Sequence, residues 1–173
     1  MTQELMDLKT SILEGRYGDA LFIVDELEGM SKQAILAKIE SYLMMLLIHL
    51  IKNQVEQRLT SSWANSIRTS LREIKKWNLK DNKTSYYINS DEWEYLIEEG
   101  VIEDAIAEAS EEVMNGAYNQ FQLGEMIDKT LILQRTLNLI NLTYQYSKKE
   151  LPAILAENLM QLPGGEDWSN RRN

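Results

Sequence analysis

The chain has 173 residues, of which 44% are hydrophobic and 26% are charged, and its formal net charge is −9. This length suits one domain with a well-buried core, and the mixture is that of a globular protein rather than a disordered one. There is no cysteine, which excludes disulfides, thiolate catalysis and cysteine-bound metal sites.

The N-terminal residues "MTQELMDLKT" lack the basic start and the apolar stretch of a signal peptide. The longest apolar run, residues 42–51 with His49 inside it, has roughly half of the length that spans a bilayer. We therefore expect a cytoplasmic protein that has no membrane partner.

Charge is unevenly distributed along the chain. Residues 1–30 have a net charge of −5, residues 31–80 of +6, residues 81–115 of −10, and residues 116–173 are neutral. An acidic total repels nucleic acid and anionic membranes at long range. The adjacent basic and acidic blocks indicate neighbouring helices of complementary charge, with a dedicated binding patch as the alternative.

Apolar residues recur every three or four positions along almost the whole chain, and both prolines lie near its C-terminus, so helices are predicted nearly throughout. The first is expected over residues 2–14 and ends at Gly15. A second is expected over residues 19–28 and ends at Gly29. A third, long helix is expected over residues 31–58.

Further helices are predicted over residues 61–77, 90–114 with a break at Gly100, 125–146 and 152–161. Residues 163–173 are expected to form a flexible tail. The sequence therefore predicts an all-α fold, a helical bundle of five to seven helices around one long central helix, with residues 1–162 as a single domain.

Motifs that carry chemistry are missing from the sequence. Neither glycine-rich phosphate-binding pattern occurs, and there is no Gly-x-Ser-x-Gly elbow. A carboxylate-bridged two-metal site would need Glu-x-x-His on two helices, but the chain has a single histidine. We therefore expect no metal and no cofactor.

The single histidine, His49, lies in the leucine-rich stretch "LLIHLIK" and has two interpretations. It can be a general base, a phosphoryl acceptor or a metal ligand. It can also be a structural residue that donates a ring proton to a carbonyl or carboxylate, next to Lys52, which opposes its protonation. The catalytic interpretation would pair His49 with Glu26 or Glu28.

The basic segment 31–80 suggests a nucleic-acid interaction, because arginines and aromatic rings both contact nucleic-acid strands. However, Trp63 and Trp77 also fit the apolar stripe of the helix over residues 61–77, so we do not expect nucleic acid to be the partner.

The stretches "LLIHLIKNQ", "SSW" and "SIRTSLREI" resemble the signature of the domain of unknown function 29 family, all-helical bacterial proteins that are numerous in cyanobacteria. The resemblance covers roughly residues 20–115. The matching residues are His49, Lys52, Ser62, Trp63, Ser66, Ile67, Arg68 and Arg72.

Two features depart from the family pattern. Many members have proline and extra arginines where this chain has "NQVEQRLTS", and residues 117–162 form a C-terminal extension without resemblance to the family. The resemblance implies a helical fold and a bacterial cytosolic protein, and it implies no activity.

We expect a non-enzymatic protein-interaction or regulatory module, whose partner is another protein or a second copy of the chain. The candidate binding residues are Lys52, Trp63, Arg68 and Arg72. The alternatives are a small enzyme that uses His49, with Arg68 as an anion clamp, and a nucleic-acid-binding protein.

Overall fold

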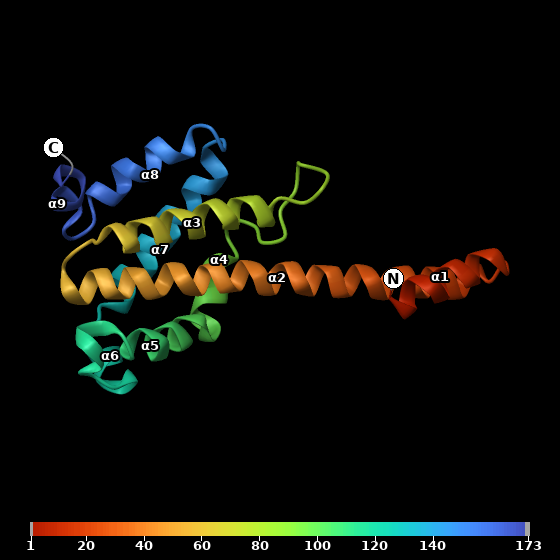
Figure 1. The fold of residues 1–173 in the computed structure, drawn as a ribbon, viewed down its shortest axis with the longest axis horizontal. Helices are drawn as coiled ribbons and strands as arrows, with labels where there is room; N and C mark the ends of the chain where they lie inside the picture. The colour runs from red at the N-terminus through yellow and green to blue at the C-terminus, as the bar shows by residue number, and fades with distance from the viewer. Residues whose placement is uncertain (1, 172–173) are drawn as a thin grey trace. The chain divides into compact units, whose positions relative to one another are not determined.

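A computed structural model describes residues 2–171 of the chain, and within this range it consists of helices and connecting loops, without a β-strand. The α-helices are α1 (Gln3–Leu13), α2 (Tyr17–Glu56), α3 (Ser61–Asn78), α4 (Trp93–Leu96), α5 (Ile102–Ser110), α6 (Gln120–Met126), α7 (Lys129–Gln145), α8 (Leu151–Met160) and α9 (Gly165–Asn170). A π-helical turn, η1 (Ile97–Val101), and a 3-10 turn, η2 (Val113–Gly116), flank α5. The predicted all-α bundle with one long helix is confirmed (Figure 1).

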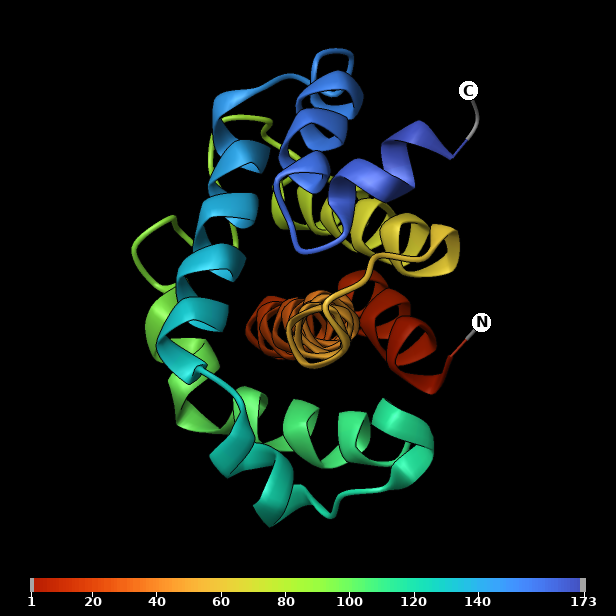
Figure 2. The ribbon, with the colours of Figure 1, turned by 90° about the vertical axis from the view of Figure 1, so that its left-hand side faces the viewer.

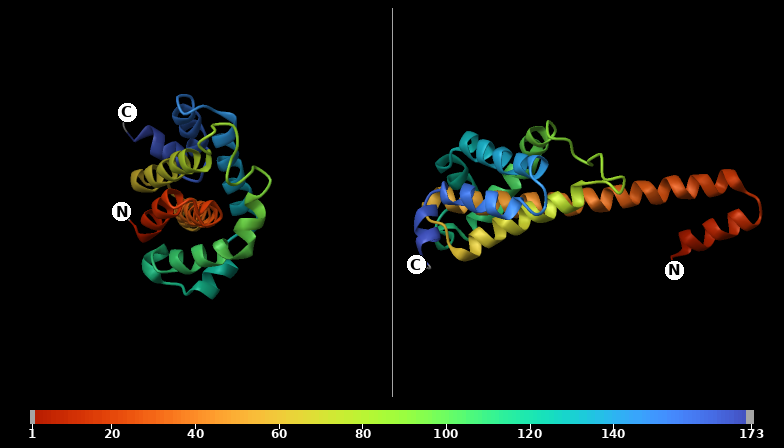
Figure 3. Two further views of the ribbon diagram at one scale, coloured as in Figure 1. Left: turned by 90° about the vertical axis from the view of Figure 1, so that its right-hand side faces the viewer. Right: turned by 90° about the horizontal axis from the view of Figure 1, so that it is seen from above.

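The chain divides into two compact units, Met1–Lys38 (unit 1) and Ile39–Asn173 (unit 2), and α2 contributes to both. Unit 1 is a helical hairpin, in which α1 runs back along the first part of α2 (Figure 3, right). Gly15 makes the turn with a φ of 71°, the left-handed conformation that glycine adopts without strain. The predicted first helix and its glycine end are confirmed.

The two helices predicted on either side of Gly29 are one continuous helix, α2, so the predicted end at Gly29 was wrong. A glycine inside a helix costs about 1 kcal/mol relative to alanine. That cost does not break a helix whose neighbouring residues favour it and which contains no proline. The glycine signal ends a helix only where the chain also needs a left-handed turn, as it does at Gly15.

The core of unit 2 forms around the second half of α2. The α2 side chains of Ile39, Leu43, Leu46, Leu47 and Ile51 are fully buried. Figure 2 looks along this helix and shows α3, α5 and α7 on different sides of it. A helix that is apolar on all sides is stable only when other helices surround it, and this explains the dense leucine run.

Two of the predicted helices are interrupted. The helix predicted over residues 90–114 is divided into α4, η1 and α5, and Gly100 lies at the predicted break with a φ of 144°. The helix predicted over residues 125–146 is also divided, because Ile127 is extended and Asp128 caps the start of α7 by accepting a hydrogen bond from the Leu131 N–H.

The stretch predicted as a flexible tail contains α9. Its two glycines allow backbone to approach backbone. A Cβ on Gly164 would lie 2.7 Å from the Arg58 Cα, and one on Gly165 would lie 2.2 Å from the Leu159 carbonyl oxygen. The helical structure was missed because polar residues and glycines also describe a loose end, and no local pattern indicates a partner backbone.

Candidate functional site

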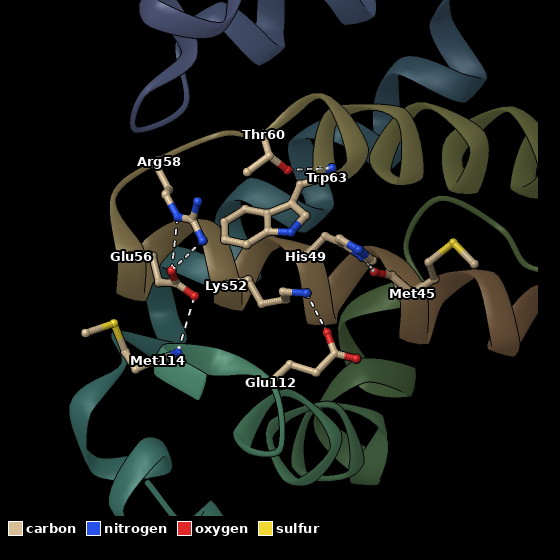
Figure 4. Close-up of polar contacts among 9 residues, drawn as sticks. All are labelled: Met45, His49, Lys52, Glu56, Arg58, Thr60, Trp63, Glu112 and Met114. Atoms are coloured by element: carbon tan, nitrogen blue, oxygen red, sulfur yellow. Dashed lines mark hydrogen bonds and ion pairs between the residues drawn. The ribbon is translucent and has the colours of Figure 1, made fainter. Parts of the chain in front are cut away.

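The sequence-predicted candidates fall into three places. His49, Lys52 and Trp63 lie together near the C-terminal end of α2 (Figure 4). Arg68 and Arg72 lie further along α3 and line a groove. Glu26 and Glu28 are exposed residues of unit 1.

His49 is half-buried, and its Nδ1 lies 2.7 Å from the carbonyl oxygen of Met45, one turn earlier in α2. Because a carbonyl only accepts, this bond places a proton on Nδ1 and leaves Nε2 as the basic nitrogen of the neutral ring. Burial lowers the pKa of His49 and the charge of Lys52 lowers it further, while the Met45 bond and the charge of Glu112 raise it. The net direction is downward, so the ring is neutral at pH 7.

Lys52 forms an ion pair with Glu112, which follows α5. The distance from Lys52 Nζ to the Glu112 carboxylate is 2.5 Å, and the lysine side chain is 10% exposed while the glutamate side chain is 60% exposed. The bond to Lys52 lowers the pKa of Glu112. This contact joins the basic and acidic blocks of the sequence, as their adjacency predicts.

Trp63 is packed between cations. It is 8% exposed, the Lys52 ammonium lies 5.0 Å from its ring centroid, and the Arg58 guanidinium carbon lies 4.8 Å from it. Arg58 is held in turn by Glu56 at 2.9 Å, and Glu56 accepts a bond from the Met114 N–H at 3.4 Å. Figure 4 shows these side chains converging between the end of α2, the start of α3 and the segment after α5. We call Lys52, Glu56, Arg58, Trp63 and Glu112 the Trp63 cluster.

The Trp63 cluster has the geometry of a structural joint. Cation–π contacts and ion pairs hold the ends of three segments together. Each charge in the cluster has a partner, and the more buried cation, Lys52, touches both a ring and a carboxylate. A charge so arranged fixes the packing of helices and is not free to receive a ligand.

Arg68 and Arg72 line a groove between α3 and the start of α8, with a volume of about 530 Å³. We call it the α3–α8 groove. Its apolar lining residues are Leu79, Leu151, Pro152 and Leu155, and its charged lining residues are Arg68, Arg72, Glu73, Lys75, Lys76 and Lys148. Five cations and one acid beside apolar side chains suit an anionic ligand that also has an apolar face.

The catalytic pairing of His49 with Glu26 or Glu28 stays a prediction. Within unit 2, the acid whose charge acts on His49 is Glu112, and His49 does not line the α3–α8 groove. Among the described residues, no group of three or more histidines, aspartates or glutamates is placed to hold a metal ion.

Several contributors to these sites were not predicted from the sequence. Glu112 is 60 residues from Lys52 in the chain, and its position inside an acidic run does not distinguish it from its neighbours. Lys148 reaches the α3–α8 groove from the loop before α8, and Trp168 of α9 packs against Arg68 with a distance of 5.5 Å from the guanidinium carbon to the ring centroid. Only the packing of helices far apart in sequence identifies them.

Comparison with known proteins adds a family and no function. No curated protein and no solved structure matches the chain. The sequence model of the family described as "Domain of unknown function DUF29" matches residues 19–115, which include α2, α3 and α5 with the Trp63 cluster. Because this match covers more than half of the chain, the protein belongs to the DUF29 family.

Proposed function

We propose that this protein is a protein-interaction module and that unit 1 carries a binding surface. The supporting observation is the exposure of its large apolar side chains. Of the fourteen large hydrophobic side chains exposed within residues 2–171, eight belong to unit 1, which is under a quarter of the chain: Leu5, Met6, Ile12, Leu13, Tyr17, Leu21, Phe22 and Met30.

Within the described part of unit 1, the buried side chains are Ser11 and Ala20. A helical hairpin that buries two small residues has almost no core of its own. Burying a large apolar side chain stabilises by roughly 1.5–3 kcal/mol, so covering even a few of these eight is a substantial gain. Abundant exposed apolar surface is typical of a protein-binding site.

We infer a cytoplasmic location and no membrane partner, which leaves protein as the occupant of this surface. By length and composition, α2 could cross a membrane, and 33% of its most apolar stretch is buried inside the protein. The buried part includes the core residues between Ile39 and Ile51. Their burial in the core of unit 2 explains why this stretch of α2 is apolar.

The proposal can be tested by photo-crosslinking in cells. Phe22 is 63% exposed in unit 1, and Phe121 in α6 is 75% exposed, so the two positions form a matched pair. With Phe22→benzoylphenylalanine, we expect one or a few discrete adducts, because a bound partner lies over the residue. With Phe121→benzoylphenylalanine, we expect none. Absence of adducts at Phe22, or the same adducts at both positions, would contradict the proposal.

The α3–α8 groove favours a second candidate function, the binding of an acidic amphipathic segment of a partner protein. The apolar lining residues of the groove can contact the apolar face of an amphipathic helix, and the cations can attract its acidic side chains. Nucleic acid fits less well, because the residues that line the groove include no aromatic ring on which a base could stack.

A comparison of two ligands separates these alternatives. We expect an acidic amphipathic peptide to bind more tightly than single-stranded DNA, and Arg72→Glu to abolish the binding. Lys149→Glu is the matched control, because Lys149 is exposed and does not line the groove. Tighter binding of DNA that weakens steeply with salt would favour nucleic acid instead.

A further inference from the structure

Residues 20–37 of α2, which all lie in unit 1, have a pattern that is symmetric about the point between Glu28 and Gly29. Counted outward from this point, apolar residues mirror apolar residues and an acid mirrors a base. The mirrored pairs are Leu27 and Met30, Asp25 and Lys32, Ile23 and Ala34, Phe22 and Ile35, Leu21 and Leu36, and Ala20 and Ala37. The apolar exception is Val24, whose mirror position holds Gln33.

A symmetric pattern of this kind is what a helix needs to pair with a copy of itself in the antiparallel direction. In such a pair, a two-fold axis passes midway between the two helices at right angles to both, and residues on the contact face lie opposite their mirror residues on the other copy. Opposite charges at mirrored positions then attract in both halves of the contact. In a parallel pair the same positions would bring Asp25 against Asp25 and Lys32 against Lys32.

Helical geometry shows which face can meet the second copy. At about 100° per residue, Asp25 and Lys32 both point within about 10° of the direction of the second copy, and Leu21 and Leu36 within about 30°. Glu28 and Gly29 lie about 50° to either side, and Phe22 and Ile35 about 70°. The mirrored charge pair is therefore at the centre of this face, with mirrored apolar residues around it.

This face is available in unit 1. On the opposite side of α2, Ala20 is buried and Ile23 and Leu27 are half-buried, whereas Met30 is exposed. On the proposed face, Leu21 and Phe22 are 65% and 63% exposed, Asp25 and Lys32 are exposed, and Ile35 and Leu36 are half-buried. A Cβ on Gly29 would meet nothing within 4 Å, so the backbone there is open to a second helix.

We propose that unit 1 binds a second copy of the chain through an antiparallel pairing of residues 20–37 of α2, centred between Glu28 and Gly29. Asp25 of each copy pairs with Lys32 of the other, and Leu21 and Phe22 pack against Leu36 and Ile35 of the other copy. Gly29 at the crossing allows the two helices to approach closely. This inference rests on the proposed function and specifies the partner of that surface.

Charge reversal gives the first test, with association measured by sedimentation equilibrium of the full chain. Asp25→Lys places lysines opposite each other in both halves of the contact, and Lys32→Asp does the same with aspartates. We expect each single variant to raise the dimer dissociation constant by about tenfold or more. The double variant Asp25→Lys/Lys32→Asp restores the attraction and should return the constant to near the wild-type value. Both residues are exposed, so the folded chain tolerates the changes.

Matched control variants are Glu26→Lys and Ser31→Asp. These residues are also exposed in α2, and they point about 110° away from the direction of the second copy. Their dissociation constants should remain within about threefold of wild type, since distant charges are screened.

Crosslinking of introduced cysteines gives the second test, because the protein contains no cysteine. Asp25→Cys and Lys32→Cys chains are mixed in equal amounts and treated with a short bismaleimide. The antiparallel pair predicts crosslinks mainly between the two different chains, since like positions lie about 10 Å apart along the helix axis. A parallel pair predicts crosslinks between identical chains.

The outcomes distinguish this inference from the proposed function. A dimer that is insensitive to the charge reversals, or that crosslinks in the parallel pattern, overturns the antiparallel pairing. So does a chain that stays monomeric at millimolar concentration. In each of these cases, adducts of a different protein at Phe22 would still support a protein-binding role for unit 1.

Discussion

Lys52 is the residue at which the Trp63 cluster is most sensitive to change. Its ammonium is mostly buried and depends on one carboxylate, that of Glu112. We expect Glu112→Gln to lower the free energy of unfolding by about 1–2 kcal/mol, since it removes a charged hydrogen bond whose acceptor is largely exposed. Urea denaturation at pH 7 measures this. Glu111→Gln is the control, because Glu111 is an exposed neighbour, and it should change stability little. Equal loss in both variants would contradict the role of the ion pair.

The same pair predicts a dependence of stability on pH. Lys52 lowers the pKa of Glu112 below its ordinary value of 4.5. The carboxylate therefore contributes stability that is fully present above about pH 4.5 and is lost as the pH falls through the lower pKa of the folded state. In Glu112→Gln the loss of stability below pH 4.5 should be smaller than in the wild-type protein. Denaturation series at pH 6 and pH 3.5 measure the difference, and parallel curves would contradict it.

His49 affects the stability of the fold in a higher pH range than Glu112 does. Burial lowers its pKa below the ordinary 6.5, so the unfolded chain takes up a proton first as the pH falls. Stability is therefore lost from about pH 6.5 downward, until the folded state is also protonated. We expect His49→Gln, whose amide can still donate to the Met45 carbonyl, to lose less stability between pH 7.5 and pH 5.5 than the wild type. An unchanged pH profile would mean that the ring is solvated in the folded protein.

At the scale of single residues, the sequence predicted part of the candidate site. His49, Lys52 and Trp63 were singled out by type and spacing, and they do lie together. Arg68 and Arg72 were grouped with them but line the α3–α8 groove instead. The difference follows from the rotation of α3, because residues five and nine positions after Trp63 lie at other angles on the helix. Glu112 could not be found, since it joins Lys52 only through tertiary packing.

Helices were predicted well where the apolar periodicity is strong, and less well where a glycine determines whether the helix continues. The start of α8 at Pro152 and the break at Gly100 follow from local rules. Gly29 lies inside α2, whereas Gly164 makes a left-handed turn before α9. What separates them is whether another backbone approaches, and that is a property of the fold.

Gly164 should therefore be the glycine least tolerant of a side chain. Its φ is +71°, and a Cβ would lie 2.7 Å from the Arg58 Cα. We expect Gly164→Ala to lower the free energy of unfolding by about 2 kcal/mol or more, through backbone strain and overlap together. Gly116→Ala is the control, because Gly116 has a φ of +74° and a Cβ there would lie 3.2 Å from the Glu111 carbonyl oxygen. Thermal denaturation of both variants measures the loss of stability, and the difference between them reports the overlap with Arg58. Equal losses of stability would show that backbone strain is the whole effect.

At the scale of the molecule, the two units differ in what holds them together. Unit 2 has a core of fully buried aliphatic side chains, whereas the described part of unit 1 buries only Ser11 and Ala20. Local opening of a segment becomes easier as its buried apolar contacts become fewer. The amides of unit 1 should therefore exchange with solvent through local opening, and those of the α2 core and α3 only through global unfolding.

Hydrogen exchange at two protein concentrations links this difference to association. If unit 1 pairs with a second copy, the amides of residues 20–37 gain protection as dimer forms, because opening then has to break the contact as well. We expect exchange of this segment to slow by about tenfold between a concentration tenfold below the dissociation constant and one a hundredfold above it, because the monomeric fraction falls by about that factor. Exchange of α3, whose residues belong to unit 2, should not depend on concentration. In Asp25→Lys the segment should exchange faster than in the wild-type chain at the higher concentration, because less of the variant is dimeric there. Equal protection of residues 20–37 at low and high concentration in the wild-type chain would show that unit 1 is stabilised without a second copy.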